Sequence, residues 1–258
     1  MYKLRDWIPE SSLDWYYLSG EPKAIRLLLK ERIHWVDSIN LCTNPAAISF
    51  IEKNLDKINW SALSLNPAAI HLLKKNPGKI NWTNLSSNPA AIDLLTENPD
   101  KIDWDLVSAN PGAIDLLEKN LHRCNWAYLS SNPAAIHLLK KNPIKIKWTH
   151  LSSNPAAIDL LQKNPERINW PTLTINPAAI ELLTTNPDKI CWPYLCKNPA
   201  AIHLLEANKD RIVWAYLSAN PAIFEYDYEA MTRPFTEELM ANRFHPKNFD
   251  KFEAWGYE

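Results

Sequence analysis

Glycine and cysteine are scarce in this chain, and long apolar runs are missing. Four glycines among 258 residues leave no glycine-rich loop of the kind that cradles a phosphate. No apolar run approaches the roughly 18 residues that span a bilayer, and the N-terminus lacks the apolar core of about 7–15 residues that marks a secretory signal. The formal net charge is −1, so no strong overall field attracts nucleic acid or an acidic membrane. We therefore expect an intracellular protein without a membrane partner.

The four cysteines do not form a disulfide framework. Cys42, Cys124, Cys191 and Cys196 occupy places filled elsewhere in the chain by other residue types, which indicates free thiols in a reducing compartment. Cys191 and Cys196 form a tight cluster with His203, but this cluster lacks a fourth ligand and the usual zinc spacing. We expect neither a metal nor a cofactor.

The dominant feature of the sequence is a repeat of 22 residues that begins with Asn-Pro. A period of this length is typical of stacked units that bury their apolar faces against their neighbours. The opening asparagines are Asn44, Asn66, Asn88, Asn110, Asn132, Asn154, Asn176, Asn198 and Asn220. A tryptophan follows with the same period at Trp60, Trp82, Trp104, Trp126, Trp148, Trp170, Trp192 and Trp214.

Numbering each unit from its asparagine makes Asn132 position 1 and Ser153 position 22. The first half of the unit predicts a helix of about nine residues. Asn132 is a preferred N-cap, and Pro133 suits the first helical position. Alanine, leucine and lysine follow as good helix formers, and Asn142 can end the helix in a left-handed conformation before Pro143. A helix this short is stable only when neighbouring units pack against it.

The second half of the unit carries isoleucine, tryptophan and leucine at positions 15, 17 and 20. This spacing favours a 3₁₀ turn or a second short helix. The competing interpretation is a strand, because Ile-x-Trp alternates with a period of two. The fold class predicted is an all-α solenoid of 22-residue units with a helical C-terminal cap.

The chain is divided into three segments. Residues 1–43 are degenerate N-terminal repeats, in which Pro22, Trp35 and Leu41 fit the pattern although the Asn-Pro turn is lost, and Trp15–Ser19 supply a further half unit. Residues 44–219 are eight full units, and residues 220–258 are a half repeat followed by a helix expected near 244–256. We expect an elongated superhelix whose end units face water and whose last unit is covered by the C-terminal helix.

Position 14 carries a cation in every full unit, and we call this column the cation ladder. One hypothesis is a groove for a polyanion such as nucleic acid. The other is structural, because a cation here complements a helix C-terminus and can pack its stem on the tryptophan ring three residues later. The ladder consists of Lys57, Lys79, Lys101, Arg123, Lys145, Arg167, Lys189 and Arg211.

Position 19 varies between units and includes Tyr128, His150, Tyr194 and Tyr216, which we call the recognition strip. Exposed tyrosine and histidine in a varying column are typical of protein recognition. The alternative is that these side chains fill space between unequal neighbours. No catalytic signature accompanies them, because acids and histidines are spread along the chain without converging on one pocket. We expect no enzymatic activity.

The repeat phrase Asn-Pro-Ala-Ala-Ile-x-Leu-Leu-x-x-Asn-Pro-x-Lys-Ile-x-Trp-x-x-Leu-Ser resembles repeat proteins encoded in many copies by giant nucleocytoplasmic DNA viruses. The opening Leu4–Pro9, Leu13–Trp15 and the closing Phe244-His245-Pro246 resemble them too. The resemblance implies a viral, intracellular protein of the host cytoplasm or viral factory, with an interaction role or a virion-associated one. In its alternation of short helix and turn, the unit is also similar to the leucine-rich repeat variant fold, which implies an α/3₁₀ superhelix.

These observations favour a non-enzymatic scaffold that binds proteins. One alternative is a structural virion component, which would co-purify with particles. The other is polyanion binding through the cation ladder, which would give retention on immobilised nucleic acid that falls steeply with salt.

Overall fold

The computed structural model describes residues 2–31 and 38–241, and it confirms an all-α repeat solenoid. Each full repeat contains two short α-helices. The first follows a one-turn 3₁₀ helix that begins at the proline of Asn-Pro, and the second begins at the tryptophan in every full repeat. The second half of the unit is therefore helical, and the strand interpretation is wrong.

Asparagine at position 1 starts the first helix of the repeat, as predicted. Asn132 has extended backbone angles (φ −76°, ψ 115°), and its Oδ1 accepts a hydrogen bond of 3.0 Å from the Ala134 N–H. The end of this helix differs from the prediction. Asn142 has φ −131° and ψ 59° rather than a left-handed conformation. Its Nδ2 donates to the Leu138 carbonyl at 2.9 Å, so the side chain satisfies a carbonyl in the last turn.

A second N-cap stands at position 16, before the tryptophan helix. Asn125 accepts hydrogen bonds from the backbone N–H groups of Ala127 and Tyr128, and Asp103 accepts one from the N–H of Leu106. Asparagine and aspartate are preferred here because their short side chains satisfy free N–H groups of the first turn. This cap explains why a helix as short as Trp60–Leu63 begins at its tryptophan, since Asn59 accepts from the Ala62 N–H at 2.9 Å. The helix Trp148–Leu151 begins at the same position without such a bond, because Lys147 has no acceptor to offer.

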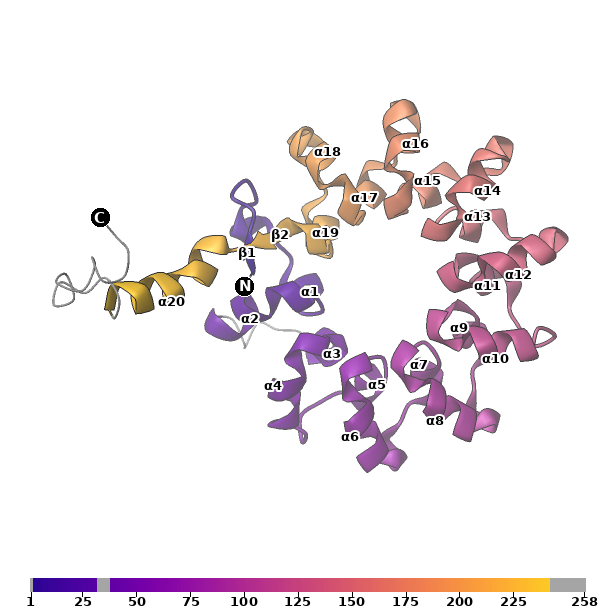
Figure 1. Ribbon diagram of the computed structural model, residues 1–258, viewed down its shortest axis with the longest axis horizontal. Coiled ribbons are helices and arrows are strands. Elements are labelled where there is room, and N and C mark those ends of the chain that lie inside the picture. Colours follow the sequence, from indigo (N-terminus) through magenta and orange to yellow (C-terminus); the bar gives the residue numbers. More distant parts are fainter. Residues whose placement is uncertain (1, 32–37, 242–258) are drawn as a thin grey trace, which may run out of the picture.

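The helices form a closed ring (Figure 1). The tryptophan helices lie on the inner side of the ring and the Ile-Leu helices on the outer side. The inner helices are α1 (Trp15–Leu18), α3 (Ser38–Thr43), α5 (Trp60–Leu63), α7 (Trp82–Ser86), α9 (Trp104–Ala109), α11 (Trp126–Ser131), α13 (Trp148–Leu151), α15 (Trp170–Leu173), α17 (Trp192–Leu195) and α19 (Trp214–Leu217). The outer helices are α2 (Ile25–Glu31), α4 (Ile48–Glu52), α6 (Ile70–Lys75), α8 (Ile92–Glu97), α10 (Ile114–Lys119), α12 (Ile136–Lys141), α14 (Ile158–Gln162), α16 (Ile180–Thr185) and α18 (Ile202–Glu206).

Short elements complete the ring. The chain begins with strand β1 (Tyr2–Leu4) and ends, in its described part, with strand β2 (Phe224–Tyr226) and helix α20 (Tyr228–Ala241). The 3₁₀ helices before the outer helices are Pro22–Ala24, Pro45–Ala47, Pro67–Ala69, Pro89–Ala91, Pro111–Ala113, Pro133–Ala135, Pro155–Ala157, Pro177–Ala179 and Pro199–Ala201, with Pro221–Ile223 before β2. Those before inner helices are Glu10–Ser12, Pro77–Lys79, Pro99–Lys101, Pro143–Lys145, Pro165–Arg167, Pro187–Lys189 and Lys209–Arg211.

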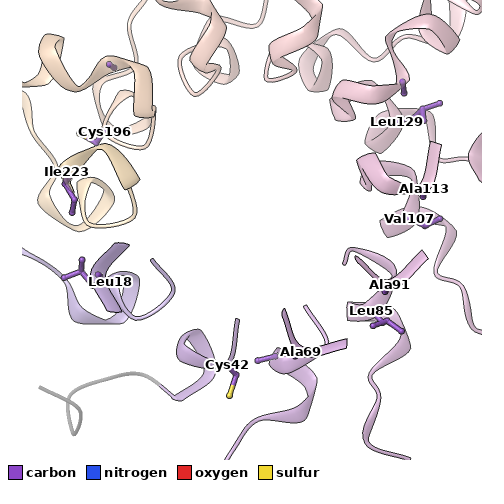
Figure 2. Close-up of a cluster of buried hydrophobic side chains, with 14 of the residues drawn as sticks. Leu18, Cys42, Ala69, Leu85, Ala91, Val107, Ala113, Leu129, Cys196 and Ile223 are labelled. Atoms are coloured by element: carbon purple, nitrogen blue, oxygen red, sulfur yellow. The ribbon is translucent and has the colours of Figure 1, made fainter. Parts of the chain in front are cut away.

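The core runs from repeat to repeat around the ring (Figure 2). In the repeat that begins at Asn132, the alanine at position 4, the leucine at position 8 and the leucine at position 20 (Ala135, Leu139 and Leu151) have no exposed area. Two polar positions are equally buried, namely the asparagine at position 1 and the serine at position 21 (Asn132 and Ser152). Buried polar groups are tolerated only when they are hydrogen-bonded.

The buried asparagines bond to one another around the ring. The Nδ2 of Asn132 donates to the carbonyls of Asn110 and Ser108 in the preceding repeat, each at 3.0 Å. The same pair of bonds recurs at each asparagine from Asn66 to Asn220. We call this column the asparagine ladder. One side chain thus caps its own helix and joins two repeats, so the residue has little freedom to change.

The serines form a second joint between repeats. Ser130 Oγ donates to the Trp126 carbonyl at 2.7 Å and accepts from the Lys147 N–H of the next repeat at 3.0 Å. Where threonine or cysteine replaces serine, the same bond persists. Thr174 accepts from the Cys191 N–H, and Cys196 Sγ accepts from the Val213 N–H at 3.3 Å.

The ring closes through a repeat assembled from both ends of the chain. Asn220–Ile223 supply its first half and Asp14–Gly20 supply its second half. The Asp14 N–H donates to Ser218 Oγ at 2.8 Å, which is the serine joint between residues 204 positions apart. In Figure 2, Leu18 and Ile223 face each other at this seam. The serine joint at the seam is therefore the same hydrogen bond as in the internal serine joints.

A small sheet fastens the seam. Strand β1 pairs with β2 in antiparallel register, with Tyr2 opposite Tyr226 and Leu4 opposite Phe224. The Arg5 N–H donates to the Ile223 carbonyl at 3.0 Å, and its Nε donates to the Ala222 carbonyl at 2.8 Å.

Further side chains bridge the seam. Arg5 also lies 3.3 Å from the Glu225 carboxylate, and the Lys209 ammonium lies 5.5 Å from the centre of the Trp7 ring. Leu4, Arg5 and Trp7 belong to the opening motif of the sequence, whose structural role is thus to close the ring.

Two expectations about the ends need correction, and a third falls outside the described residues. The elongated superhelix with two water-facing ends is wrong, because the first repeat covers the last; α20 instead extends away from the ring (Figure 1). The turn at Pro22 is not lost, because the Glu21 carboxylate replaces asparagine and accepts from the Lys23 N–H at 3.0 Å. The helix expected near 244–256 and the residue Trp35 lie outside the described residues.

Glu21 interrupts the asparagine ladder, since a carboxylate has no Nδ2 to donate. The Lys23 ammonium takes over part of this role by donating to the Pro221 carbonyl at 3.0 Å. Burial raises the pKa of Glu21, and the hydrogen bond from the Lys23 N–H partly opposes that rise. This junction is therefore less well matched than the internal ones.

Candidate functional site

The cation ladder lies over the tryptophan column, but in a different pairing from the one predicted. Each cation that contacts a ring covers the tryptophan of the preceding repeat, not its own. The distances to the ring centres are 5.2 Å for Lys101 on Trp82, 4.2 Å for Arg123 on Trp104, 4.6 Å for Lys145 on Trp126, 5.0 Å for Arg167 on Trp148 and 4.8 Å for Arg211 on Trp192. The tryptophans are only half-buried, and these cations cover part of the exposed ring surface.

This geometry gives the ladder a structural role. A cation over a tryptophan face is attracted by the electron-rich ring, and each such pair stabilises a joint by about 0.5–1 kcal/mol. Every ladder residue is nevertheless exposed. Some of the charge is matched locally, since Arg167 lies 3.4 Å from Glu166 and Lys189 lies 3.3 Å from Asp188. The contacts of these five cations therefore support the structural hypothesis for the ladder.

The recognition strip lies on the inner helices α11, α13, α17 and α19. Tyr128 and Tyr194 are 38% and 40% exposed, His150 is exposed and Tyr216 is half-buried. The rings of Tyr128 and His150 meet edge to face at 6.4 Å. The Lys197 ammonium lies 4.5 Å over the Tyr216 ring. Neighbouring members of the strip are therefore close enough for one partner to touch both.

Ring closure adds a residue that the sequence repeat alone did not show. Tyr17 occupies position 19 of the composite repeat, which follows the repeat of Tyr216 around the ring. Tyr194, Tyr216 and Tyr17 therefore stand in three consecutive repeats. The match of Trp15–Ser19 to Trp-x-x-Leu-Ser could have identified Tyr17 as a position-19 residue. Its place beside the last repeat follows only from the closed ring.

Two of the three histidines on the described outer helices, His71 and His137, pair with acids. His71 Nε2 lies 2.8 Å from Glu52, and His137 Nε2 lies 2.5 Å from Glu118 of the preceding repeat. These contacts are exposed. They link successive outer helices without forming a pocket.

No disulfide joins the four cysteines, and Cys42, Cys124 and Cys196 are buried. Burial raises the pKa of Cys196 and of Cys124, and the hydrogen bond from the Val213 N–H partly opposes the rise at Cys196. Within residues 2–31 and 38–241, no three acidic, histidine or cysteine side chains are grouped so as to hold a metal ion.

Comparisons with known proteins give no family for this chain. No family model, no curated protein and no solved structure matches it. Over the part of the chain that the structure describes, none of the helices has the length and apolar content needed to cross a membrane.

Proposed function

We propose that this protein is a non-enzymatic scaffold of a giant DNA virus that binds a protein partner through its inner helices. The supporting observation is the recognition strip. Position 19 tolerates alanine at Ala62 and threonine at Thr172 in the same backbone setting, so the fold itself does not require a large ring there. Tyr128 and Tyr194 nevertheless expose aromatic surface, and tyrosine is enriched where proteins contact one another.

The ring is a suitable frame for such contacts. Its repeats are joined by the asparagine ladder and by serine hydroxyls, through hydrogen bonds that are buried or half-buried. A frame whose joints are satisfied holds exposed side chains at fixed separations, which lowers the entropy cost of binding. The resemblance to giant-virus repeat proteins supports a location in the host cytoplasm or viral factory. A structural role in the virion is the alternative, and enrichment in purified particles over infected-cell lysate would favour it.

The proposal is tested by site-specific photo-crosslinking. A photoreactive phenylalanine analogue placed at Tyr194 on α17 is expected to crosslink to a discrete protein in infected cells. The same analogue placed at Asp115, an exposed residue of the outer helix α10, is the matched control and is expected to give no discrete product. Discrete crosslinks at Asp115 and none at Tyr194 would contradict binding through the inner helices.

A further inference from the structure

The inner helices have one face that the core does not cover. On each of them, positions 20 and 21 are buried, whereas positions 18, 19 and 22 lie on the other side of the helix. We call these three positions, taken over all the inner helices, the inner-helix face. Every residue of this face except Ala62 retains exposure to solvent. The contacts Asn84 Nδ2 to Ser61 Oγ (3.0 Å) and Tyr128 to His150 join its neighbouring repeats.

This face carries almost no charge. Among the inner helices that the structure describes, only Asp105 and Lys197 contribute a formally charged side chain to it. Both already have partners within the protein. Asp105 Oδ1 accepts from Asn125 Nδ2 at 3.0 Å, and the Lys197 ammonium lies over the Tyr216 ring. An incoming molecule therefore meets no free ion on the inner-helix face.

The outer helices differ sharply from this. Their exposed positions 6, 9 and 10 carry charged or ionisable residues in most repeats, such as His137, Lys140 and Lys141 in one repeat. Because charge amounts to 22% of the whole chain, its near-exclusion from one continuous face is a property of that face. The repeat skeleton does not require the exclusion, since position 18 accepts Asp105 and position 22 accepts Lys197 without loss of the helix.

What the inner-helix face offers is aromatic rings, hydroxyls and amides. Tyr16 is 51% exposed, and Thr83 and Thr149 are exposed. Exposed apolar surface is added by Ile39 (48%) and Leu65 (36%). Tyrosine presents an apolar ring together with a hydroxyl that can donate or accept. Such a surface can contact uncharged side chains and hydrogen-bond peptide groups at the same time.

We infer that the inner-helix face binds a polypeptide segment that is poor in charged residues. A charged side chain placed against this face would lose hydration without gaining a counter-ion, which is unfavourable. A nucleic acid would find no free cation there to replace its counter-ions. A neutral segment loses little on leaving water and gains contacts with the rings. The inference rests on the proposed protein-binding function and specifies the chemistry of the bound segment.

The test uses random 12-residue peptides displayed on phage and selected against the intact protein. Peptides that are enriched are expected to contain fewer charged residues than the unselected library. Their affinity is expected to fall roughly tenfold or more in the double variant Tyr128→Ala/Tyr194→Ala, because exposed aromatic anchors dominate such contacts. The matched control is Asp115→Ala/His137→Ala on the outer helices, which is expected to leave binding unchanged. Thermal melting checks that both variants fold.

A second variant separates charge from shape. Ala127→Glu/Thr149→Glu places two carboxylates on the inner-helix face and leaves both tyrosines in place; it is expected to abolish binding of the same neutral peptides. Enrichment of charge-rich peptides, binding that survives loss of the tyrosines, or no enrichment at all would overturn the inference. Retention of glycans in place of peptides by this face would overturn it too. If charge-rich peptides are selected and their binding depends on Tyr128 and Tyr194, this inference is wrong but the proposed protein-binding function is not. If the photo-crosslinking experiment gives no crosslinks at Tyr194, the proposed function itself is wrong.

Discussion

Replacing Asn132 with aspartate is expected to lower the free energy of unfolding by roughly 3–5 kcal/mol. The substitution keeps the oxygen that caps Ala134 but replaces the donating amide with a carboxylate. That carboxylate faces the carbonyls of Ser108 and Asn110 in a fully buried place. Two acceptors lose their donor and a charge is buried beside them, which is why the expected loss is large for an isosteric change. Urea denaturation of the two proteins measures it.

The control for this prediction is Asn142→Asp in the same repeat. Asn142 is half-buried and donates one hydrogen bond, to Leu138, so its loss is expected to be about 1 kcal/mol. Equal losses in the two variants would show that the asparagine ladder does not hold the repeats together.

The Asn132→Asp variant should also respond to pH. Burial beside carbonyls raises the folded pKa of the new carboxyl above its unfolded value of about 3.9. The protonated carboxyl can donate one hydrogen bond, so the stability that it contributes to the folded variant is fully present below the unfolded pKa. That stability is lost as the pH rises through the folded pKa. The difference from the original protein should therefore be smaller at about pH 4 than at about pH 7, and a difference that does not change with pH would contradict this explanation.

Deleting residues 2–13 is expected to open the ring. The deletion removes β1 and the Arg5 bonds, and it takes away the buried side chains Ile8 and Leu13. Two buried aliphatic side chains contribute about 1.5–3 kcal/mol each. The Asp14–Ser218 and Lys23–Pro221 hydrogen bonds remain, but each contributes only about 0.5–1.5 kcal/mol, which is less than the deleted side chains contribute. The radius of gyration from small-angle X-ray scattering should increase.

The matched deletion removes residues 228–258. The seam contacts of Arg5, Asp14 and Lys23 all involve residues before Tyr228. This second deletion is therefore expected to leave the ring closed, with the smaller radius expected of a chain that has lost its projecting helix. A 2–13 deletion that remains as compact as the full chain would show that the seam is held elsewhere.

The helices could be predicted from the sequence because their causes are local. The N-cap at Asn132 and the proline after it act within one turn and need no knowledge of the neighbours. The second role of the same asparagine could not be predicted in this way. Its Nδ2 reaches carbonyls 22 and 24 residues earlier, and which groups lie there depends on how two repeats stack. The cation ladder shows the same limit. The sequence predicts that each cation packs on a tryptophan, but the ring that it covers belongs to the preceding repeat.

Closure of the ring depends on the whole chain. The rotation between successive repeats is set by every joint. No sequence motif indicates that these rotations add up to one full turn over this number of repeats. A signal was nevertheless present at the ends. The chain begins with the second half of a repeat at Asp14–Gly20 and ends its repeats with a first half at Asn220–Ile223. Two complementary halves are what a ring requires, whereas each end of an open superhelix would face water.

The distance between the two ends of the repeat array tests the ring most directly. Spin labels at Asp6 and Asp210, both exposed, would be attached to cysteines introduced in a Cys191→Asn background, because Cys42, Cys124 and Cys196 are buried. Pulsed dipolar spectroscopy should then give a single short distance, since Lys209 lies over the ring of Trp7. Repeats stacked about 8–10 Å apart in an open superhelix would separate the labels by on the order of 80 Å, and that result would contradict the closed ring.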